Sequence, residues 1–504
     1  MMINLYYFRK TIDALPKSNK LSGKHYLFVT VRSYSFVFHQ ELFFANILAR
    51  NGATVYVLLD NGILPHWDTY QLHEERMPAN ASVTRKNKFV RKIYTFLFHH
   101  RNIKFIKTST LLKTEMVESI CSKESLNGSD EKNAISSVRR FFECGYYDPK
   151  NAKHQLYYDK TITNIKLMKY FVRTLQQSYN FEAVITSHGI YSIWGTAYNY
   201  FRNIDIPVYV YGAHCYKSHH THFTDTLAQT LSLDSSCVEY MKNGILCNEN
   251  IKAVDDYFLA RRNHTTKDTS IYYSWMNDKK NIKVTKGEKT LNYAMFPNII
   301  WDGDVAQRDT IFNGMLDWMK KTINYFIFHQ RNNLIIRFHP AEATLWKDTI
   351  CLSDVIDKLY PNLDTYSNIT VIKADQQIDT YEFIQNNVDI GLIYEGILSL
   401  ELTHMHKPVI SPSCNRYTGG TFVLKPSTVE EYYNLLENFD FDGYFTEEKK
   451  EEFYKYAYWY LYLSAYVMPN YSEKEFGKIV YNKSSIKKLA DPDFVKLYNK
   501  IVSL

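Results

Sequence analysis

A hydrophobic run over residues 334–336 ends abruptly, and this break constrains the fold more than any other feature of the chain. Apolar and β-branched residues without polar alternation are typical of a parallel strand that is covered on both faces. Pro340 has no backbone N–H and a fixed φ, so the strand cannot continue through it. Arg337 and His339 are therefore expected at the carboxyl end of a strand, where open α/β sheets bind their ligands.

The side chains of Arg337 and His339 suit a phosphate or diphosphate group. A guanidinium presents a fork of N–H donors that matches phosphate oxygens, and an imidazole beside it adds a further donor. The same residues also permit a structural interpretation, in which the arginine pairs with a carboxylate and the histidine caps the strand end. This segment alone does not separate the two interpretations.

A second pattern of strand, tight turn, short helix and strand covers residues 388–411. Both strands are apolar without alternation, so both are expected to be buried on two faces. The turn contains Glu395 and Gly396, and the helix after it would point its free N–H groups at the ligand crevice, with Ser399 in its first turn. Glu401 follows at a place where a carboxylate can accept hydrogen bonds from a ribose diol. Two independent segments that face one crevice favour a binding site over a purely structural role.

Together these motifs resemble the C-terminal half of a GT-B glycosyltransferase and, more narrowly, the bacterial capsule and surface-polysaccharide biosynthesis proteins of that fold. The resemblance spans residues 290–440 and, more loosely, residues 25–225. It rests on an Arg-x-His-Pro-x-Glu element at residues 337–342 and on Glu, Ser-x-Glu and Lys-Pro-Val elements within residues 395–409. It implies an α/β protein of GT-B type with two Rossmann-like domains that face a central cleft. It also implies transfer of a sugar from a nucleotide-activated donor to a growing surface glycan.

The resemblance implies that the C-terminal half binds the nucleotide-sugar donor. Arg337 and His339 would hold the phosphate, Ser399 and the neighbouring amides would complete the cradle, and Glu401 would hold the ribose. The glycine-containing loop at residues 418–421 is flexible enough to close over the sugar. The expected donor-binding residues are Arg337, His339, Glu342, Glu395, Gly396, Ser399, Glu401, Gly419, Gly420, Asn298 and Asp302.

Neither a metal ion nor another cofactor is expected. GT-B enzymes generally stabilise the leaving phosphate with protein cations and helix N-termini, so the resemblance implies a metal-independent reaction. Asp302 and Asp304 have the Asp-x-Asp spacing of metal-dependent glycosyltransferases, but no apolar strand ends directly on them. A helix-capping turn before Gln307 is the preferred interpretation of that segment.

The first part of the chain predicts a βαβ unit. Residues 26–31 and 54–59 read as strands, and residues 39–50 read as the helix between them, which ends at Asn51 and Gly52. Such a crossover is expected to be right-handed. No Gly-x-Gly-x-x-Gly pattern follows the first strand, which argues against an ordinary dinucleotide site.

Residues 184–189 and 207–214 read as further strands, with polar ends at His188 and His214. The resemblance implies that this half of the chain binds the acceptor, a glycan or lipid-linked glycan. A structural role for either histidine is the alternative.

A general base for the acceptor hydroxyl is expected from the N-terminal half. The candidates are His39, Glu41, Asp60 and His188. A base has to reach the acceptor oxygen and titrate near neutral pH, which favours histidine or a carboxylate with a raised pKa. His39 is preferred because it opens the helix that follows the first strand. A retaining enzyme needs no such base, and the sequence leaves the stereochemistry open.

The predicted domain organisation has four parts. Residues 1–22 form an N-terminal arm, and residues 23–250 form a Rossmann-like acceptor domain with an inserted, partly helical and mobile region at residues 76–145. Residues 285–440 form a Rossmann-like nucleotide-sugar domain. Residues 441–504 form C-terminal helices that pack back on the N-terminal domain.

Composition agrees with a large enzyme that acts in the cytoplasm. A chain of 504 residues that is 45% hydrophobic can bury the cores of two or more domains. The net charge is +7, and the charged residues are scattered rather than clustered, so no nucleic-acid partner is expected. This charge permits peripheral association with the inner face of the cytoplasmic membrane. We find no transmembrane run or signal peptide, and the seven cysteines have no zinc-binding spacing.

The donor and the exact activity are left open by the sequence. The His-Pro element with a downstream serine resembles the pattern of transferases that use CMP-activated keto sugars. Glu401 before Lys407 and Pro408 equally resembles the ribose clamp of enzymes that use UDP-sugars. Two alternatives are a nucleotide-sugar epimerase of the same fold and a non-catalytic GT-B scaffold in a polysaccharide assembly complex.

Overall fold

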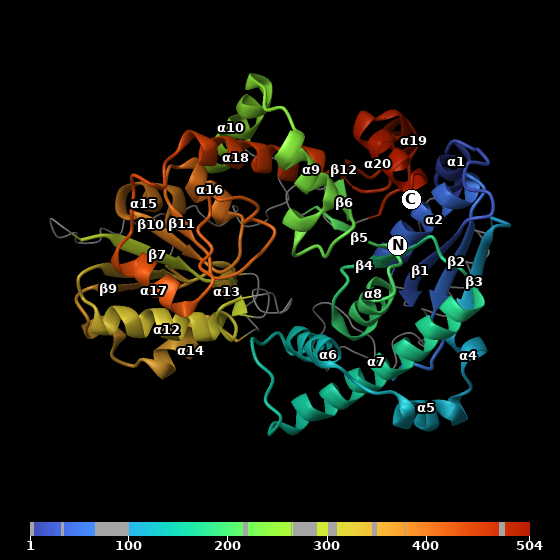
Figure 1. Ribbon diagram of the computed structural model, residues 1–504, viewed down its shortest axis with the longest axis horizontal. Helices are drawn as coiled ribbons and strands as arrows, with labels where there is room; N and C mark the ends of the chain where they lie inside the picture. The colour runs from blue at the N-terminus through green and yellow to red at the C-terminus, as the bar shows by residue number, and fades with distance from the viewer. Residues whose placement is uncertain are drawn as a thin grey trace. The chain divides into compact units, whose positions relative to one another are not determined.

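The computed structural model describes residues 5–31, 35–65, 100–214, 220–263, 265, 290–300, 310–344, 350–376, 378–472 and 479–504. The chain divides into two compact units, each of which contains one β-sheet with helices (Figure 1). Unit 1 comprises Met1–Phe142, Tyr147–Ala228 and Leu463–Leu504, and unit 2 comprises Glu143–Tyr146 and Gln229–Tyr462.

Unit 1 is built on a seven-stranded sheet with the order β12-β6-β5-β4-β1-β2-β3. The strands are β1 (His25–Val31), β2 (Thr54–Leu59), β3 (Ile103–Lys107), β4 (Ala183–Ser187), β5 (Val208–Ala213), β6 (His220–Thr224) and β12 (Tyr466–Val467). The first five strands are parallel, whereas β6 pairs antiparallel with β5 and β12 pairs antiparallel with β6. Their order, 3-2-1-4-5 along the chain, is that of a doubly wound Rossmann-like sheet.

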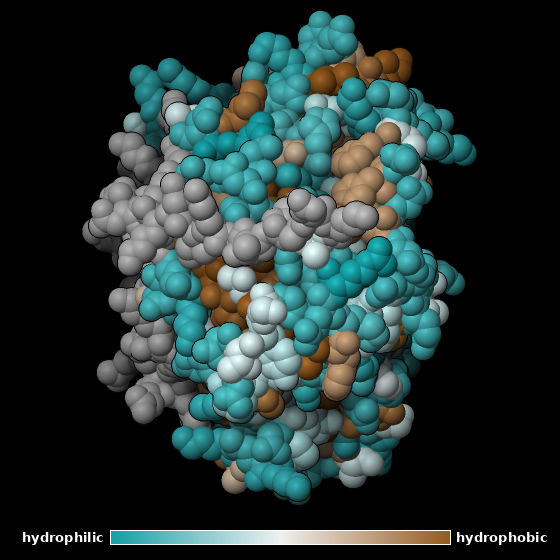
Figure 2. All heavy atoms as spheres, turned by 90° about the vertical axis from the view of Figure 1, so that its left-hand side faces the viewer, coloured by the Kyte–Doolittle hydropathy of each residue, from teal (hydrophilic) through white to brown (hydrophobic). Residues whose placement is uncertain are grey.

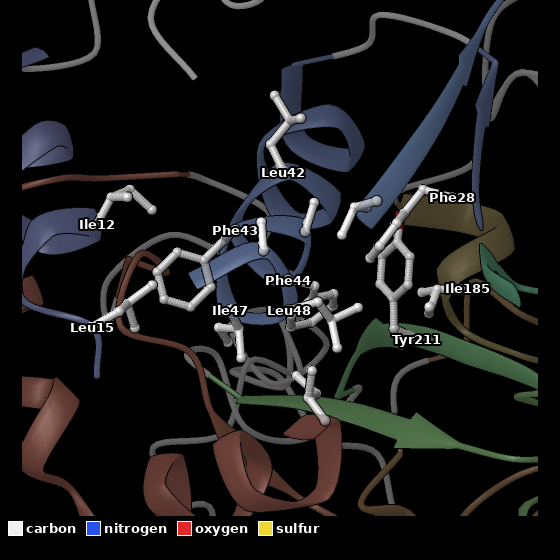
Figure 3. Close-up of a cluster of buried hydrophobic side chains, with 14 of the residues drawn as sticks. Ile12, Leu15, Phe28, Leu42, Phe43, Phe44, Ile47, Leu48, Ile185 and Tyr211 are labelled. Atoms are coloured by element: carbon white, nitrogen blue, oxygen red, sulfur yellow. The ribbon is translucent and has the colours of Figure 1, made fainter. Parts of the chain in front are cut away.

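The helices of unit 1 come from both ends of the chain and from the segments between its strands. They are α1 (Leu5–Asp13), α2 (Ser35–Arg50), α4 (Thr108–Leu111), η3 (Thr114–Met116), α5 (Val117–Lys123), α6 (Gly128–Phe141), α7 (Ala152–Ser178), η4 (Tyr191–Gly195), α8 (Thr196–Arg202), α19 (Lys483–Lys487), η9 (Lys488–Ala490) and α20 (Pro492–Val502). Helix α2 supplies much of the buried core, where the ring centroid of Phe44 lies 5.4 Å from that of Tyr211 in β5 (Figure 3). All residues of this helix from Phe38 to Arg50 are buried, the polar ones included, so this part of α2 is covered on every side.

Both ends of the chain differ in part from the sequence-based expectation. Residues 1–22 were expected to form a loose arm, but α1 is a helix, and Phe8, Ile12 and Leu15 are buried in the unit 1 core. At the other end, the predicted C-terminal helices divide. Helix α18 (Glu447–Tyr458) belongs to unit 2, whereas residues from 463 onward belong to unit 1, where Phe494 of α20 packs on α2.

The region predicted as a mobile insertion, residues 76–145, contributes to the sheet of unit 1. Residues 66–99 lie outside the described residues, but β3 pairs in register with β2 and forms the edge of the sheet. Helix α6 begins with a capping box between Asn127 and Asp130, and Lys169 of α7 forms an ion pair with Asp130 at 2.8 Å. The described part of this region is therefore a packed part of the fold.

Unit 2 is built on a five-stranded parallel sheet with the order β11-β10-β7-β8-β9. The strands are β7 (Asn292–Phe296), β8 (Asn333–Arg337), β9 (Ile369–Ile372), β10 (Ile390–Ile393) and β11 (Val409–Ile410). Counted along unit 2, the order is again 3-2-1-4-5. The predicted α/β class with two Rossmann-like sheets, the building blocks of the GT-B fold, is confirmed.

Helices cover both faces of the unit 2 sheet (Figure 1). Helices α12 and α14 lie on one face, and α15 and α16 lie on the other. The remaining helices complete the unit around them. The helices of unit 2 are η5 (Leu231–Leu233), α9 (Ser235–Asn243), α10 (Asn248–Arg262), α12 (Met315–Phe328), α13 (Ala341–Thr344), α14 (Leu352–Leu359), η7 (Leu363–Thr365), α15 (Thr380–Asn387), α16 (Leu398–His404), α17 (Val429–Glu437), α18 and η8 (Trp459–Leu463). Trp318 of α12 anchors the first face, because its indole N–H donates to the hydroxyl of Tyr432 inside the core.

Three further observations concern the surface, the helices and the cysteines. Hydrophilic side chains dominate the face that Figure 2 shows. Among the described helices, none combines the length and the apolar character that crossing a bilayer requires. The cysteines that lie in the described residues form no disulfide bonds with one another.

Candidate functional site

The strand order of unit 2 reverses between β7 and β10, which are neighbours in the sheet. Chain connections leave these two strands toward opposite faces, and such a reversal is where doubly wound sheets bind ligands. The strand ends are level, because Ile393 pairs with Phe296, and Met295 pairs with Ile336, the residue before Arg337. The segments that follow β7, β8 and β10 therefore meet at one edge of the sheet, which we call the carboxyl edge.

Arg337 is the last residue of β8 and lies buried at the carboxyl edge, with 5% of its surface exposed. Its Nη1 donates to the backbone oxygen of Lys373 at 2.6 Å, whereas its Nε has no hydrogen-bond partner in the part of the chain that the structure describes. Burial lowers the pKa of Arg337 to about 10, against the opposing effect of Asp375, so the group stays charged at neutral pH. Buried donors rarely stay unsatisfied unless a ligand or water meets them.

The structural interpretation of Arg337, a pair with a carboxylate, is not what the structure contains. None of the described carboxylates forms an ion pair or hydrogen bond with it; Asp375 acts on it only through its electrostatic field. A buried guanidinium with one hydrogen-bond partner among the described residues retains donors for an anion.

His339 caps the turn that follows β8. Its Nδ1 accepts a hydrogen bond from the backbone N–H of Ala341 at 3.2 Å. The neutral imidazole then carries its proton on Nε2, so this atom is a donor. The capping role considered from the sequence is therefore present, and it orients the ring through Nδ1.

Glu342 was predicted to bind the donor, but its carboxylate is used to connect two helices. Its Oε1 accepts from the backbone N–H of Leu352 at 3.2 Å, and its Oε2 accepts from the thiol of Cys351 at 3.4 Å. The residue is buried, and desolvation raises its pKa to about 7. Glu342 thereby ties α13 to the start of α14.

The raised pKa of Glu342 predicts a pH-dependent stability. The unfolded carboxyl group ionises near pH 4.5, whereas the folded one keeps its proton to about pH 7, so the folded state binds more protons in this window. Its contribution to the free energy of unfolding should fall as the pH rises from about 4.5 to about 7. Glu342→Gln removes the titration, so urea unfolding at both ends of the window should give this variant a smaller loss of stability with rising pH than the wild type. Equal losses in the two proteins would contradict the assignment.

The turn after β10 carries Glu395, Gly396 and Ser399. Gly396 has φ +146°, a conformation that L residues rarely adopt, which explains the glycine. Glu395 is buried, and its Oε1 lies 3.5 Å from Nη2 of Arg416. Ser399 is fully buried, and its Oγ has no hydrogen-bond partner among the described residues. Helix α16 has only 7 residues, so the side chain of Ser399 matters more here than the expected helix dipole.

Glu401 takes part in a buried network inside unit 2. Its Oε1 accepts from Nε of Arg261 in α10 at 2.5 Å and from the hydroxyl of Tyr381 in α15 at 2.8 Å. Only 5% of its surface is exposed. This differs from the predicted ribose-binding role, because a carboxylate already neutralised by an arginine is a poor acceptor for a diol. The sequence held no local signal for it, since Arg261 lies 140 positions away.

The glycine loop at residues 418–421 is attached to α18. A Cβ at Gly419 would lie 1.9 Å from the ring of Tyr456, so this glycine permits close packing. The backbone N–H and Oγ1 of Thr421 both donate to Glu452 at 2.6 Å. Gly420 is similarly confined by the ring of Phe422. In this conformation the loop is anchored, whereas the sequence suggested a segment free to close over a sugar.

Two predicted donor-binding residues follow β7. Asn298 is half-buried at the carboxyl edge, and its Oδ1 accepts from the backbone N–H of Ile299 at 2.8 Å. Asp302 lies outside the described residues, as does Asp304. Among the residues that are described, no group of three or more His, Cys, Asp or Glu side chains could hold a metal ion.

Three of the predicted catalytic bases are buried in unit 1. His39 and Glu41 lie in α2 with none of their surface exposed, and burial lowers the pKa of His39 to about 3. The carboxylate of Asp60 accepts from the backbone N–H groups of residues 62, 63 and 64 and from the hydroxyl of Thr108. Asp60 therefore organises the turn after β2. A base has to reach its substrate, so none of these three suits the role in this conformation.

His188 differs from the other three, because it is half-buried and lies directly after β4. Its Nδ1 contacts Oγ of Ser187, and its ring centroid lies 5.7 Å from that of Trp194. The reversal of the unit 1 sheet falls between β4 and β1, so His188 lies at the place where this sheet would bind a ligand.

The sequence analysis missed the strained backbone at this reversal. Val31 at the end of β1 has φ +53°, His188 has φ +53°, and Tyr191 has φ +72°. A β-branched or aromatic residue in this region is uncommon, and such strain tends to collect at functional sites. The π-helical turn η4 follows at once, and π-turns are also frequent at such sites. Gly189 was the one signal of this turn in the sequence.

No family model matches the chain, and no curated protein matches it by sequence. Structural similarity exists to KpsC of Thermosulfurimonas dismutans, described as a beta Kdo 2,4 transferase, with 11% identity over 64% of this chain and 87% of that one and a TM-score of 0.36. UDP-GlcNAc 2-epimerase of Methanocaldococcus jannaschii is similar at 12% identity over 57% of this chain and 79% of that one, with a TM-score of 0.24. ADP-heptose LPS heptosyltransferase II of E. coli is similar at 7% identity over 82% of this chain and 97% of that one, with a TM-score of 0.21.

These similar structures include the transferase and epimerase classes that the sequence analysis named. At such TM-scores they carry no information about activity. The fold assignment rests on the strand orders of the two sheets and on their registers.

Proposed function

We propose that this protein is a glycosyltransferase that binds a nucleotide-activated sugar at the carboxyl edge of unit 2 and transfers the sugar to a surface glycan. The observation that carries the proposal is Arg337, a buried cation beside a strand-order reversal whose Nε has no protein partner in the described residues. A sheet core gains nothing from such a group, whereas a phosphate there would satisfy it.

In the proposed reaction, the bond between the anomeric carbon and the phosphate oxygen breaks, and negative charge grows on the departing nucleotide. Arg337 would neutralise this charge, with Nε2–H of His339 and the hydroxyl of Ser399 as further donors. Because the charge is larger in the transition state than in the bound donor, these groups would accelerate the reaction as well as bind the substrate. No step of this proposal requires a metal ion.

The proposed donor-binding set is smaller than the predicted one. It keeps Arg337, His339, Ser399 and the turn at Glu395 and Gly396. It leaves out Glu401, because Arg261 and Tyr381 already bind its carboxylate. It also leaves out the glycine loop, which α18 holds. Whether the nucleotide is CMP or UDP therefore has to be decided by binding.

We further propose His188 as the base that assists the acceptor hydroxyl, in place of His39. Replacing His188 with asparagine should lower turnover by roughly 100-fold, because general-base catalysis contributes at least this factor. Nucleotide affinity should stay unchanged. His329→Asn is a matched control, since that histidine is exposed at the end of α12, away from any strand end of the carboxyl edge. Equal turnover in His188→Asn and the wild type would remove His188 from the mechanism.

The test of the function is a panel of CMP-, UDP- and GDP-sugars. The first measurement is the rise in melting temperature, which a ligand causes by binding the folded state. The second is release of the free nucleotide in the presence of glycan acceptors. Stabilisation by one nucleotide family together with acceptor-dependent release supports a transferase. Conversion of the sugar without an acceptor would identify an epimerase, and no binding of any nucleotide would favour the scaffold.

A further inference from the structure

Three helices of unit 2 from distant parts of the chain pack together: α10, α16 and α18 (Figure 1). The ring centroid of Phe258 in α10 lies 5.0 Å from that of His404 in α16 and 6.1 Å from that of Phe453 in α18. Helix α16 is the short helix that carries Ser399, so whatever holds α16 also sets the position of this hydroxyl.

An ion pair connects α10 to the first turns of α16. Arg261 and Glu401 are joined at 2.5 Å, and both side chains have 6% of their surface exposed. Arg261 also lies over the ring of Tyr257 at 5.8 Å, and the hydroxyl of Tyr381 donates to the same carboxylate oxygen as Arg261. Because both groups are buried away from water, the geometry of their charged hydrogen bond is tightly defined.

A second polar contact holds the C-terminal end of α16. Nε2 of His404 lies 2.9 Å from Oδ1 of Asp255, and the hydroxyl of Tyr454 donates to the same oxygen at 2.8 Å. Asp255 and Arg261 are both on α10. One helix therefore grips α16 at two points through groups of opposite charge, which defines both the position of α16 along α10 and its rotation.

Stability alone is a weak reason for this arrangement. Removing two charges from water is costly, and apolar residues of similar volume often stabilise a core as well as a buried ion pair does. What an apolar contact lacks is direction, because dispersion and hydrophobic contacts allow a helix to slide or rotate.

We propose that Arg261 is a positioning residue for the donor site. Through Glu401 it holds α16, and thereby Ser399, in the orientation that binds the nucleotide phosphate. This inference rests on the proposed function. It gives α10, a helix that precedes the unit 2 sheet in the chain, an indirect influence on donor affinity.

The test replaces both charges at once. The double variant Arg261→Met, Glu401→Leu should keep a melting temperature close to that of the wild type, because the pair leaves together. Amide hydrogen exchange in residues 397–405 should become faster without any ligand, since α16 loses its direction. Affinity for whichever of CMP, UDP or GDP binds the wild type should fall roughly tenfold.

A matched control separates positioning from general loss of stability. Tyr432→Phe removes buried hydrogen bonds to Trp318 and Thr322 on the opposite face of the same sheet. It should lower the melting temperature and leave both nucleotide affinity and exchange in residues 397–405 unchanged. Arg261→Lys keeps the charge and should recover part of the affinity.

The remaining outcomes count either against the positioning role or against the proposed function. Unchanged exchange in residues 397–405 overturns the positioning role. Faster exchange with unchanged nucleotide affinity also overturns it, while the proposed function stands. If the wild type binds none of the nucleotides, or if the double variant and Arg337→Met both bind normally, the proposed function fails and the inference falls with it.

Discussion

Replacing Arg337 with methionine is expected to weaken nucleotide-sugar binding by roughly 100-fold and to abolish most of the transfer activity. The variant loses a charge-assisted contact to phosphate, and a hydrogen bond to a charged group contributes about 1.5–3 kcal/mol. Methionine keeps the apolar stem that packs at the end of β8. The free energy of unfolding should change by less than about 1 kcal/mol, because the guanidinium has one hydrogen bond to the described residues and its burial has a desolvation cost.

Arg331→Met is the matched control for this prediction. Arg331 lies just before the amino end of β8, and its side chain is 68% exposed. Its Nη1 forms an ion pair with Oε1 of Glu437 at 3.7 Å. Its loss changes the net charge by the same amount at the opposite edge of the sheet. Binding is measured by titration calorimetry and activity by nucleotide release. Near-normal affinity in Arg337→Met, with the control unaffected, would show that the phosphate binds elsewhere.

Glu401→Ala is expected to lower the free energy of unfolding by about 3–5 kcal/mol, because it leaves Arg261 as a buried charge without its counter-ion. Chemical denaturation measures this loss directly. A residue that only binds ribose at a ligand edge would reduce nucleotide affinity and leave stability nearly unchanged. The change in stability therefore distinguishes the two roles, because a fall in nucleotide affinity is expected from both.

The double variant Arg261→Met, Glu401→Leu completes this comparison. If Glu401 serves mainly as the partner of Arg261, removing both charges should restore most of the stability that Glu401→Ala loses. A double variant as unstable as Glu401→Ala would mean that the surrounding core cannot accept apolar groups there. A stable Glu401→Ala protein that no longer binds nucleotide would return Glu401 to the ribose-binding role.

Short-range patterns predicted the sheets well. The strands expected at residues 26–31 and 54–59 correspond to β1 and β2, and the break at Pro340 ends β8 as expected. The turn at Glu395 and Gly396 follows β10 as the sequence indicated. These features depend on backbone chemistry and on hydrophobic runs a few residues long, which a single sequence displays directly.

Features that depend on distant partners were predicted less well. The N-terminal arm became α1, because Phe8 and Ile12 find a hydrophobic core that also includes residues near the C-terminus. His39 was expected at a substrate, but its helix is covered on all sides and the ring is buried. The spacing of residues along α2 cannot reveal which neighbours will cover it.

The sequence by itself determined the α/β class, the two sheets and the residues that follow the central strands of unit 2. These follow from strand periodicity, from proline and glycine, and from the rule that parallel strands end at one edge. Only the tertiary structure decided which of those residues keep donors for a ligand. Arg337 meets one backbone oxygen at its strand end, whereas Glu401 meets Arg261 and Tyr381 from two other helices. Whether a buried polar group is satisfied depends on atoms that lie close in space, and the chain brings these together from positions far apart in the sequence.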